Sequence, residues 1–456
     1  MDTALQILQR YWRFSDFREA QKPILEAVLS DTDLLALLPT GGGKSVTFQV
    51  PALVKPGMTL VITPLVALME NQTAQLQTLG ISAACLHSQQ APEQRRKTLT
   101  GIPQGRWKLL YLSPESLLSP PAWERLQQTI INRIVLDEAH CLTSWGSSFR
   151  PDYHRIGAVR RSLGNPPLCA FTATATPRTQ QALVDLLGLQ TPKILRNSPY
   201  RANLYLQVRK IWYPQQRLKE IQQFLTQRTL ETGLIYLRTR NGTEKLAAHL
   251  RTLGFNTAAY HAGMAAEQRR ETENRWLDGK LKFLCSTNAF GMGIDKPNVR
   301  WVIHGNTPLD LAEYVQEIGR AGRDGQPSKV LLLASEPTGW LDPTDRDLHR
   351  HFRQQYLEQR KKARQQLAQL PKTGTYRLED ALSLAILHEQ GQLQWKTPFD
   401  YLLNTQSFQA SAVELNTMEG YLGCRGCRWQ FIISAFGWPK QSVCGHCDYC
   451  CPKAAF

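Results

Sequence analysis

The sequence predicts an α/β protein with two tandem parallel-sheet domains and a C-terminal helical segment that binds metal. Apolar runs alternate with helical patterns in two successive blocks, which is the pattern of βαβ units. A glycine-rich turn follows the first apolar run, and six of the ten cysteines lie between Cys424 and Cys451. We expect the domains to cover residues 1–198, 199–338 and 339–456.

Length and composition limit the classes of protein that fit. The 456 residues allow about three domains, and a hydrophobic content of 42% can fill their cores. The net charge of +16 favours a polyanionic partner such as nucleic acid, although a scattered basic surplus also fits ordinary solubility. No apolar run reaches the roughly 18 residues of a membrane span, and the amphipathic start is no signal peptide. We therefore expect a cytoplasmic, nucleoid-associated protein that does not contact membranes.

The first apolar run leads into a glycine-rich turn that opens a helix. Backbone N–H groups of such a turn can surround phosphate oxygens, Lys44 can reach the β and γ phosphates, and the Ser45 hydroxyl can ligate Mg²⁺. Leu38 stands where the first glycine of the usual spacing would be, so a plain glycine turn is the alternative. The predicted nucleotide-binding loop consists of Thr40, Gly41, Gly42, Gly43, Lys44 and Ser45.

An acidic pair, Asp137 and Glu138, closes the apolar run IINRIVL. This run reads as a buried strand, so both carboxylates emerge at its carboxyl end, where Mg²⁺ and nucleotide bind in open α/β sheets. Such a pair can hold Mg²⁺ and polarise water. The alternative is that the tetrapeptide DEAH occurs by chance.

Two aromatic residues and an arginine follow the acidic pair within a few positions. Trp145 and Phe149 can stack on unpaired bases, and Arg150 can grip phosphates. The alternative is that the aromatic residues belong to the core. If they bind DNA, nucleotide chemistry and strand contact share one short segment.

A further group lies upstream of the glycine-rich turn, in the stretch WRFSDFREAQKPI. An aromatic face of Phe14 or Phe17 with Arg18 can sandwich a flat base, and Gln21 offers a donor and an acceptor to an adenine edge. The group therefore favours ATP as the nucleotide. The alternative is that the aromatic residues only pack the helix.

The second domain lacks a glycine-rich phosphate loop but ends in QEIGRAGRDG, which contains Gln316. Arg320 and Arg323 are three residues apart and lie on one helical face. We expect this pair at the cleft between two lobes, with Arg323 directed at the γ-phosphate to stabilise transition-state charge. The alternative is a surface turn with solvated arginines.

The cysteines near the C-terminus have the spacing of a metal site. CRGC, CGHC and Cys450 provide five candidates for the four thiolates of a tetrahedral zinc site. Their density in a basic chain without a signal peptide points to metal rather than disulfides. His446 lies among them, but enough thiolates are present and we expect it to be solvated. The spacing alone leaves Cys424 and Cys427 as competing ligands.

A series of motifs runs in order through about the first 325 residues. They are FRxxQ at 17–21, TGGGKS at 40–45, TPLVALMENQ at 63–72, SPE at 113–115, DEAHCxxxWGxxFRPxY at 137–153, FTATAT at 171–176, YHAGM at 260–264, STNAFGMGIDKPNVR at 286–300 and QEIGRAGRDG at 316–325. In order and spacing the chain resembles the RecQ family of superfamily 2 DNA helicases. The aromatic loop after DEAH and the stretch FGMGIDKP are specific to that family.

The resemblance implies two RecA-like lobes that hydrolyse ATP and move along DNA. By similarity, Lys44 and Ser45 bind ATP and Mg²⁺, Asp137 ligates Mg²⁺, and Glu138 orients the attacking water. The second lobe would complete this site with Gln316, Arg320 and Arg323. The family also implies 3′ to 5′ polarity.

The resemblance assigns the aromatic loop with Trp145, Phe149 and Arg150 to the coupling of DNA to hydrolysis. The family loop often carries His and Asp where this chain has Ser147 and Ser148, so we expect weaker coupling.

The zinc module of the family reads Cx16CxxCxxC. Counting back from Cys444 selects Cys427, so Cys424 and Cys451 are spare. The implied zinc ligands are Cys427, Cys444, Cys447 and Cys450.

Two parts of the last segment each fit two interpretations. A helix over residues 342–370 carries the basic run 360–364, which fits either phosphate contact or a solvated face. Residues 371–418 read as a helix, a turn and a short strand, and fit either a winged-helix-like element or extra packing for the zinc module. Only six residues follow Cys450, so we expect no appended winged-helix or HRDC domain and only modest unwinding.

These observations predict an ATP-dependent 3′ to 5′ DNA helicase that uses ATP, Mg²⁺ and Zn²⁺. It would translocate on single-stranded DNA and unwind partial duplexes in recombination or repair. The alternatives are an RNA helicase and a DNA-binding or annealing protein with weak motor activity. The pattern leaves open the preferred DNA structure, the protein partners, the oligomeric state and the pathway.

Overall fold

The structure is a computed structural model, and it describes the chain except residues 40–41, 144–149, 292–295, 405–416, 440–441 and 453–456. The chain forms two compact units. The first unit contains residues 1–197 and 356–412, and the second contains residues 198–355 and 413–456. Within the final segment, residues 356–412 thus belong to the first unit, and residues 339–355 and 413–456 belong to the second.

The first unit is built on a parallel sheet with the strand order β3-β4-β2-β5-β6-β1-β7. In every strand except β7, side chains on the two faces enter different cores: Leu35 joins one cluster, and Leu34 joins the other. Because both faces of these strands are buried, they are largely apolar, whereas the edge strand β7 is mostly exposed. The strands are β1 (Leu34–Leu37), β2 (Met58–Ile62), β3 (Ala83–Leu86), β4 (Leu109–Leu112), β5 (Ile131–Leu136), β6 (Leu168–Thr172) and β7 (Lys193–Arg196).

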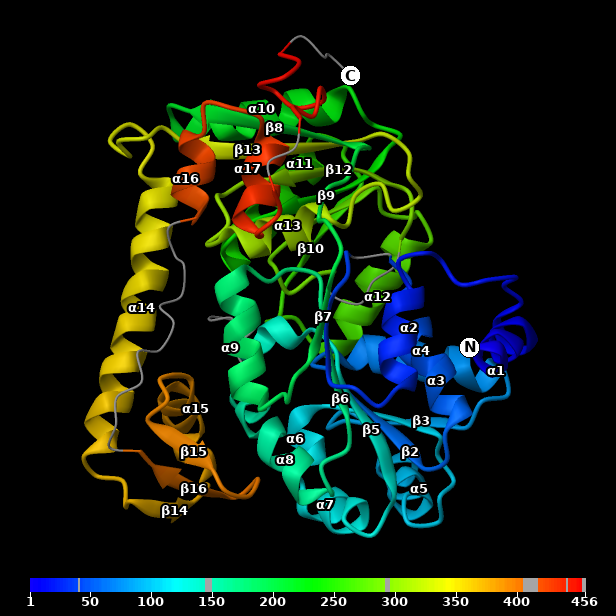
Figure 1. Cartoon of the computed structure of the whole chain (residues 1–456). Coiled ribbons are helices and arrows are strands. Elements are labelled where there is room, and N and C mark those ends of the chain that lie inside the picture. The colour runs from blue at the N-terminus through cyan, green and yellow to red at the C-terminus, as the bar shows by residue number, and fades with distance from the viewer. Residues whose placement is uncertain (40–41, 144–149, 292–295, 405–416, 440–441, 453–456) are drawn as a thin grey trace. The chain divides into compact units, whose positions relative to one another are not determined.

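Helices cover both faces of this sheet, with α2, α3 and α4 on one face (Figure 1). Local signals delimit them. Helix α9, for example, begins after Thr176, whose hydroxyl accepts from the Thr179 N–H, and ends at Gly188 in the left-handed conformation. The helices are α1 (Asp2–Ile7), η1 (Leu8–Trp12), α2 (Lys22–Leu29), α3 (Val46–Val54), α4 (Val66–Thr78), α5 (Pro92–Gly101), α6 (Pro114–Leu117), α7 (Pro120–Leu126), η2 (Ala139–Leu142), η3 (Pro151–Arg155), α8 (Ile156–Ser162) and α9 (Pro177–Leu187).

The second unit contains a parallel sheet with the order β10-β11-β9-β12-β13-β8. Its strands are β8 (Leu204–Ile211), β9 (Thr232–Tyr236), β10 (Thr257–Tyr260), β11 (Phe283–Ser286), β12 (Val299–His304) and β13 (Ser328–Ser335). Its helices are α10 (Pro214–Thr226), α11 (Arg240–Thr252), α12 (Ala266–Leu277), α13 (Leu311–Ile318), α16 (Thr417–Gly423) and α17 (Arg428–Ala435). Helix α14 (Thr344–Leu367) carries the chain from the second unit to the first.

Residues 373–403 form a small element of the first unit, which we call the helix–hairpin module. It contains β14 (Thr373–Thr375), η4 (Leu378–Asp380), α15 (Ala381–Glu389), β15 (Leu393–Trp395) and β16 (Asp400–Leu403), with the antiparallel order β14-β16-β15. Trp395 and Tyr401 pack in one cluster with Ala158 of α8. Residues 373–403 pack within the first unit, whereas Met418, at the end of the segment 371–418, lies in one cluster with Cys427 and Cys447 of the second unit. The predicted helix, turn and short strand correspond to α15, the turn at Gly391 and β15, and the strand β16 was not predicted.

None of the helices in the described part of the chain combines the length and apolarity needed to cross a bilayer.

Candidate nucleotide site and cysteine cluster

The glycine-rich turn joins β1 to α3, as the sequence predicted. Thr40 and Gly41 lie outside the described residues. Gly43 has a φ of +71°, and a Cβ at this position would lie 2.4 Å from Nε2 of Gln21. Glycine is therefore required there both by backbone conformation and by close approach.

The Gln21 side chain stabilises this turn through a hydrogen bond to its backbone. Its Nε2 donates to the Gly43 carbonyl at 2.9 Å, and its Oε1 accepts from the Arg18 backbone N–H at 2.9 Å. Phe17 is buried in a cluster with helix residues, in keeping with the packing alternative, whereas Phe14 is 55% exposed. The sequence had no signal for the contact between Gln21 and Gly43.

Lys44 meets the acidic pair at the carboxyl end of β5. Its Nζ lies 2.6 Å from Oδ1 of Asp137 and 3.5 Å from Oε1 of Glu138. Burial lowers the pKa of Lys44, but the two carboxylates outweigh this effect and the pKa is raised. Burial raises the pKa of Asp137, and the charge of Glu138 adds to the rise while Lys44 opposes it. One lysine thus pairs with two adjoining buried acids.

The Glu138 backbone adopts a left-handed conformation with φ 51° and ψ 47°. Such a conformation costs free energy for a residue with a Cβ and is concentrated at functional sites. Oε2 of Glu138 lies 3.3 Å from Nδ1 of His140, which lies 3.2 Å from Oγ1 of Thr172. Thr172 belongs to FTATAT, so two motifs 32 residues apart meet at the acidic pair. The sequence did not single out His140 or Thr172.

Arg150 connects three of the motifs within the first unit. Its Nη1 lies 3.0 Å from Oε1 of Glu115, in SPE, and its Nη2 donates to the Pro64 carbonyl, in TPLVALMENQ, at 3.2 Å. Trp145 and Phe149 lie outside the described residues.

The second unit positions QEIGRAGRDG at the end of α13. Gln316 lies on this helix, and buried Arg320 donates to the Gly291 carbonyl. Burial lowers the pKa of Arg201, and the charge of nearby Arg323 lowers it further.

The turn that carries Arg323 is held by hydrogen bonds. Gly322 has a φ of +56°, and its carbonyl accepts from Arg201 at 2.6 Å and from Asn203 at 2.8 Å. Arg300 pairs with both oxygens of Asp324 at 2.6 Å. These hydrogen bonds therefore fix the conformation of the turn, which is not a loose surface loop.

Four cysteines gather in the second unit, and their sulfur atoms lie within 4.8 Å of one another. They are Cys427, Cys444, Cys447 and Cys450. A tetrahedral site with Zn–S bonds of about 2.3 Å requires sulfurs about 3.7 Å apart, and those of Cys444 and Cys450 are 3.8 Å apart. Cys424 is outside this group, and the His446 ring nitrogen contacts the Cys444 carbonyl.

The cysteine cluster is attached to the edge strand β8. Asp448 accepts from the Val208 N–H at 2.9 Å and donates its own N–H to the Leu206 carbonyl at 2.9 Å. The Trp429 indole donates to the Leu204 carbonyl at 3.1 Å. The segment therefore covers an otherwise open sheet edge.

The two parallel sheets, the phosphate loop and the acidic pair define a helicase-type ATPase. The family model described as DEAD/DEAH box helicase matches residues 18–183, and the helicase conserved C-terminal domain matches residues 216–325.

Curated relatives identify the family. The ATP-dependent DNA helicase RecQ of Synechocystis sp. is 44% identical, over 98% of this chain and 97% of the relative. The probable ATP-dependent DNA helicase RecS of Bacillus subtilis is 41% identical over 72% of this chain and 66% of its own length, and RecQ of Haemophilus influenzae is 37% identical over 74% and 54%. The chain belongs to the RecQ family and is an ATP-dependent DNA helicase. The predicted family, α/β class and enzyme class are confirmed, and the RNA-helicase alternative is not supported.

Solved structures show the same fold. Yeast Dbp5 bound to RNA and ADP BeF3 has a TM-score of 0.63 at 18% identity, covering 77% of this chain and 91% of that one. The Mycobacterium smegmatis helicase Lhr bound to single-stranded DNA and AMP-PNP has a TM-score of 0.60 at 21% identity, covering 73% and 48%.

Proposed function

We propose that this helicase hydrolyses ATP to translocate 3′ to 5′ on single-stranded DNA and unwinds partial duplexes in recombination or repair. The observation that carries the proposal is the meeting of Lys44 with Asp137 and Glu138 at the carboxyl end of β5. In open α/β sheets this edge is where nucleotide and metal bind. The family relationship supports the polarity, the pathway and a nucleoid-associated site of action in the cytoplasm.

Each residue of the nucleotide site has a proposed role. Lys44 and the backbone of Gly42 and Gly43 bind phosphates, with Thr40 and Gly41 completing the loop. Ser45 and Asp137 supply the hydroxyl and carboxylate oxygens that Mg²⁺ prefers, and the metal would neutralise phosphate charge. Glu138 orients the attacking water. Phe14 and Arg18 bind the base, with Gln21 supporting the loop.

The other unit and the aromatic loop complete the proposed machinery. Gln316, Arg320 and Arg323 act on the nucleotide from residues 199–338. Trp145, Phe149 and Arg150 couple DNA to hydrolysis. Zinc, held by the four gathered cysteines, fixes the fold of the cysteine-bearing part of the C-terminal segment.

The test compares unwinding of matched 3′-tailed DNA, 5′-tailed DNA and RNA duplexes, with Lys44→Ala as the inactive control. We expect unwinding of the 3′-tailed DNA alone, and hydrolysis that rises with added single-stranded DNA. Glu138→Gln should retain ATP binding but lose hydrolysis by at least about 100-fold, because the water-orienting carboxylate is gone. Equal unwinding of both tailed substrates would contradict the proposed polarity.

A further inference from the structure

The helix–hairpin module contacts the first unit through the short helix η3. Arg155 of η3 is buried, and its guanidinium carbon lies 3.7 Å from the centroid of the Tyr376 ring, with Phe399 at 5.2 Å and Trp395 at 5.8 Å. Its Nε donates to the Pro398 carbonyl at 2.6 Å. One guanidinium is thus enclosed by three rings of the module, an arrangement that stabilises a desolvated cation.

The module also completes a charge pair within η3. Nη1 of Arg155 lies 2.8 Å from Oδ1 of Asp152, and the Tyr376 hydroxyl donates to the same oxygen at 3.3 Å. A buried ion pair is stabilising only when its remaining hydrogen-bonding groups are satisfied. Tyr376 contributes to both partners, the ring to the cation and the hydroxyl to the anion.

The opposite side of η3 reaches the nucleotide site. Tyr153, the residue between Asp152 and His154, is fully buried and directs its hydroxyl at the Asp137 carbonyl, 3.5 Å away. Arg150, at the start of η3, holds Glu115. A contiguous series of contacts therefore runs from the module through η3 to the residue that pairs with Lys44.

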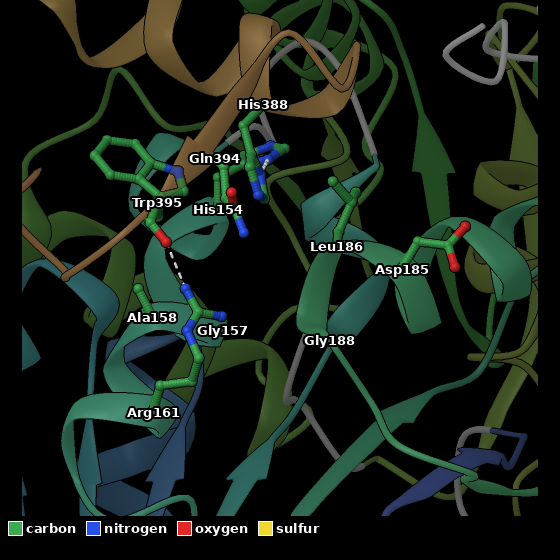
Figure 2. A pocket seen from close by; sticks show the side chains of 10 residues that line it. All are labelled: His154, Gly157, Ala158, Arg161, Asp185, Leu186, Gly188, His388, Gln394 and Trp395. Atoms are coloured by element: carbon green, nitrogen blue, oxygen red, sulfur yellow. Dashed lines mark hydrogen bonds between the residues drawn. The ribbon is translucent and has the colours of Figure 1, made fainter. Parts of the chain in front are cut away.

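A pocket of about 200 Å³ lies where η3, α8, α9 and the module meet. Figure 2 shows its lining side chains, among them His154, Arg161 and Trp395. Nδ1 of His154 lies 3.1 Å from Nδ1 of His388, and Arg161 donates to the Trp395 carbonyl. Arg155 thus adds polar and aromatic contacts to the packing of Trp395 and Tyr401 with Ala158.

We propose that Arg155 and Tyr376 are positioning residues for DNA-stimulated ATP hydrolysis. The module holds η3, and η3 holds both the backbone of Asp137 and the Arg150 end of the DNA-coupling segment. This inference rests on the proposed function, because it takes Asp137 as a ligand of the catalytic metal. Displacements of about 1 Å at such a group can lower a rate by orders of magnitude. Variants at Tyr376 measure whether these contacts couple the module to the nucleotide site.

The test uses full-length Tyr376→Ala and Tyr376→Phe, with Leu378→Ala as the matched control. Leu378 lies in the same module and is 82% exposed. We expect Tyr376→Ala to lower kcat at saturating single-stranded DNA about fivefold, with KM for ATP within about twofold, since substrate contacts remain. Tyr376→Phe keeps the ring over Arg155 and should retain most of the activity. Leu378→Ala should match the wild type.

The fold stimulation by DNA separates positioning from loss of folded protein. Unfolding lowers the basal and the stimulated rate in the same proportion, whereas displacement of the Arg150 end of the DNA-coupling segment lowers the ratio of the stimulated to the basal rate. If Tyr376→Ala does not fold, Tyr376→Leu keeps most of the apolar volume and removes the aromatic face. Wild-type stimulation in a folded alanine or leucine variant would overturn the inference. A wild-type enzyme that DNA does not stimulate would instead refute the proposed function.

Discussion

Lys44 and Asp137 form a buried ion pair across 93 residues of sequence, with Nζ 2.6 Å from Oδ1. Replacing Lys44 by alanine leaves Asp137 beside Glu138 without a cation. Breaking a buried pair costs about 3–5 kcal/mol, and uptake of a proton by Asp137 reduces that cost. We therefore expect Lys44→Ala to lower the unfolding free energy as well as abolish hydrolysis.

The loss of unfolding free energy in Lys44→Ala should grow as pH rises. Lys44 opposes the raised pKa of Asp137, so its removal raises that pKa further. The folded variant then holds a proton that the unfolded chain releases, and its stability falls as pH rises. Thermal unfolding without nucleotide at pH 5.5 and pH 8 should show the larger deficit at pH 8. Lys22→Ala, which breaks a partly exposed pair with Asp16, is the control. An equal deficit at both pH values would contradict the argument.

Zinc content should distinguish the clustered cysteines from the spare ones. Metal analysis of the wild type should give about one zinc per chain. Cys427→Ser and Cys447→Ser should lose the metal, because both sulfurs lie within the group of four. Cys424→Ser should keep it. Retention of zinc by Cys427→Ser together with its loss from Cys424→Ser would reverse the assignment.

Asp33 and Arg160 form a structural pair that takes no part in the proposed chemistry. Nη1 and Nη2 of Arg160 lie 2.8 and 2.9 Å from the two oxygens of Asp33, which also accept the backbone N–H groups of Leu168 and Gln190. The carboxylate thereby joins the starts of β1 and β6 to α8. Asp33→Ala should cost about 3–5 kcal/mol of unfolding free energy by urea titration, because Arg160 stays buried and unpaired. ATP hydrolysis per folded molecule should be unchanged, and a cost below about 1 kcal/mol would contradict this role.

Local patterns in the sequence predict much of the fold. The features that the sequence does not predict depend on contacts between residues far apart in the chain. The strand ending at Leu136 and the turn ending at Lys44 follow from apolar runs and glycine spacing, since these act over a few residues. The contact of Gln21 with Gly43 spans 22 residues and has no periodic signature. Tyr376 lies on Arg155, far away in the sequence, so no local pattern within residues 373–403 could assign that module to the first unit.

The distribution of cysteines was informative for a physical reason. Thiolates of one zinc site must lie within a few ångströms, which short loops such as that between Cys444 and Cys447 enforce directly. The one remaining ligand position depends on how the segment folds on β8, so spacing alone left Cys424 and Cys427 as competing candidates.

The contact between the helix–hairpin module and η3 should make the unfolding free energy fall in mild acid. Burial lowers the pKa of His388 to about 4, and the charge of Arg161 adds to this effect. Burial also lowers the pKa of His154 well below its ordinary value of 6.5. Between pH 6.5 and 4 the unfolded chain binds more protons than the folded one, so the contribution is complete above pH 6.5 and is lost towards pH 4. The stability advantage of the wild type over His388→Gln should shrink by on the order of 1 kcal/mol between pH 7 and pH 4.5 in urea titrations. His249→Gln, a histidine replacement at an exposed position, is the control. Parallel curves for the wild type and His388→Gln would exclude the contact between the module and η3 as the titrating element.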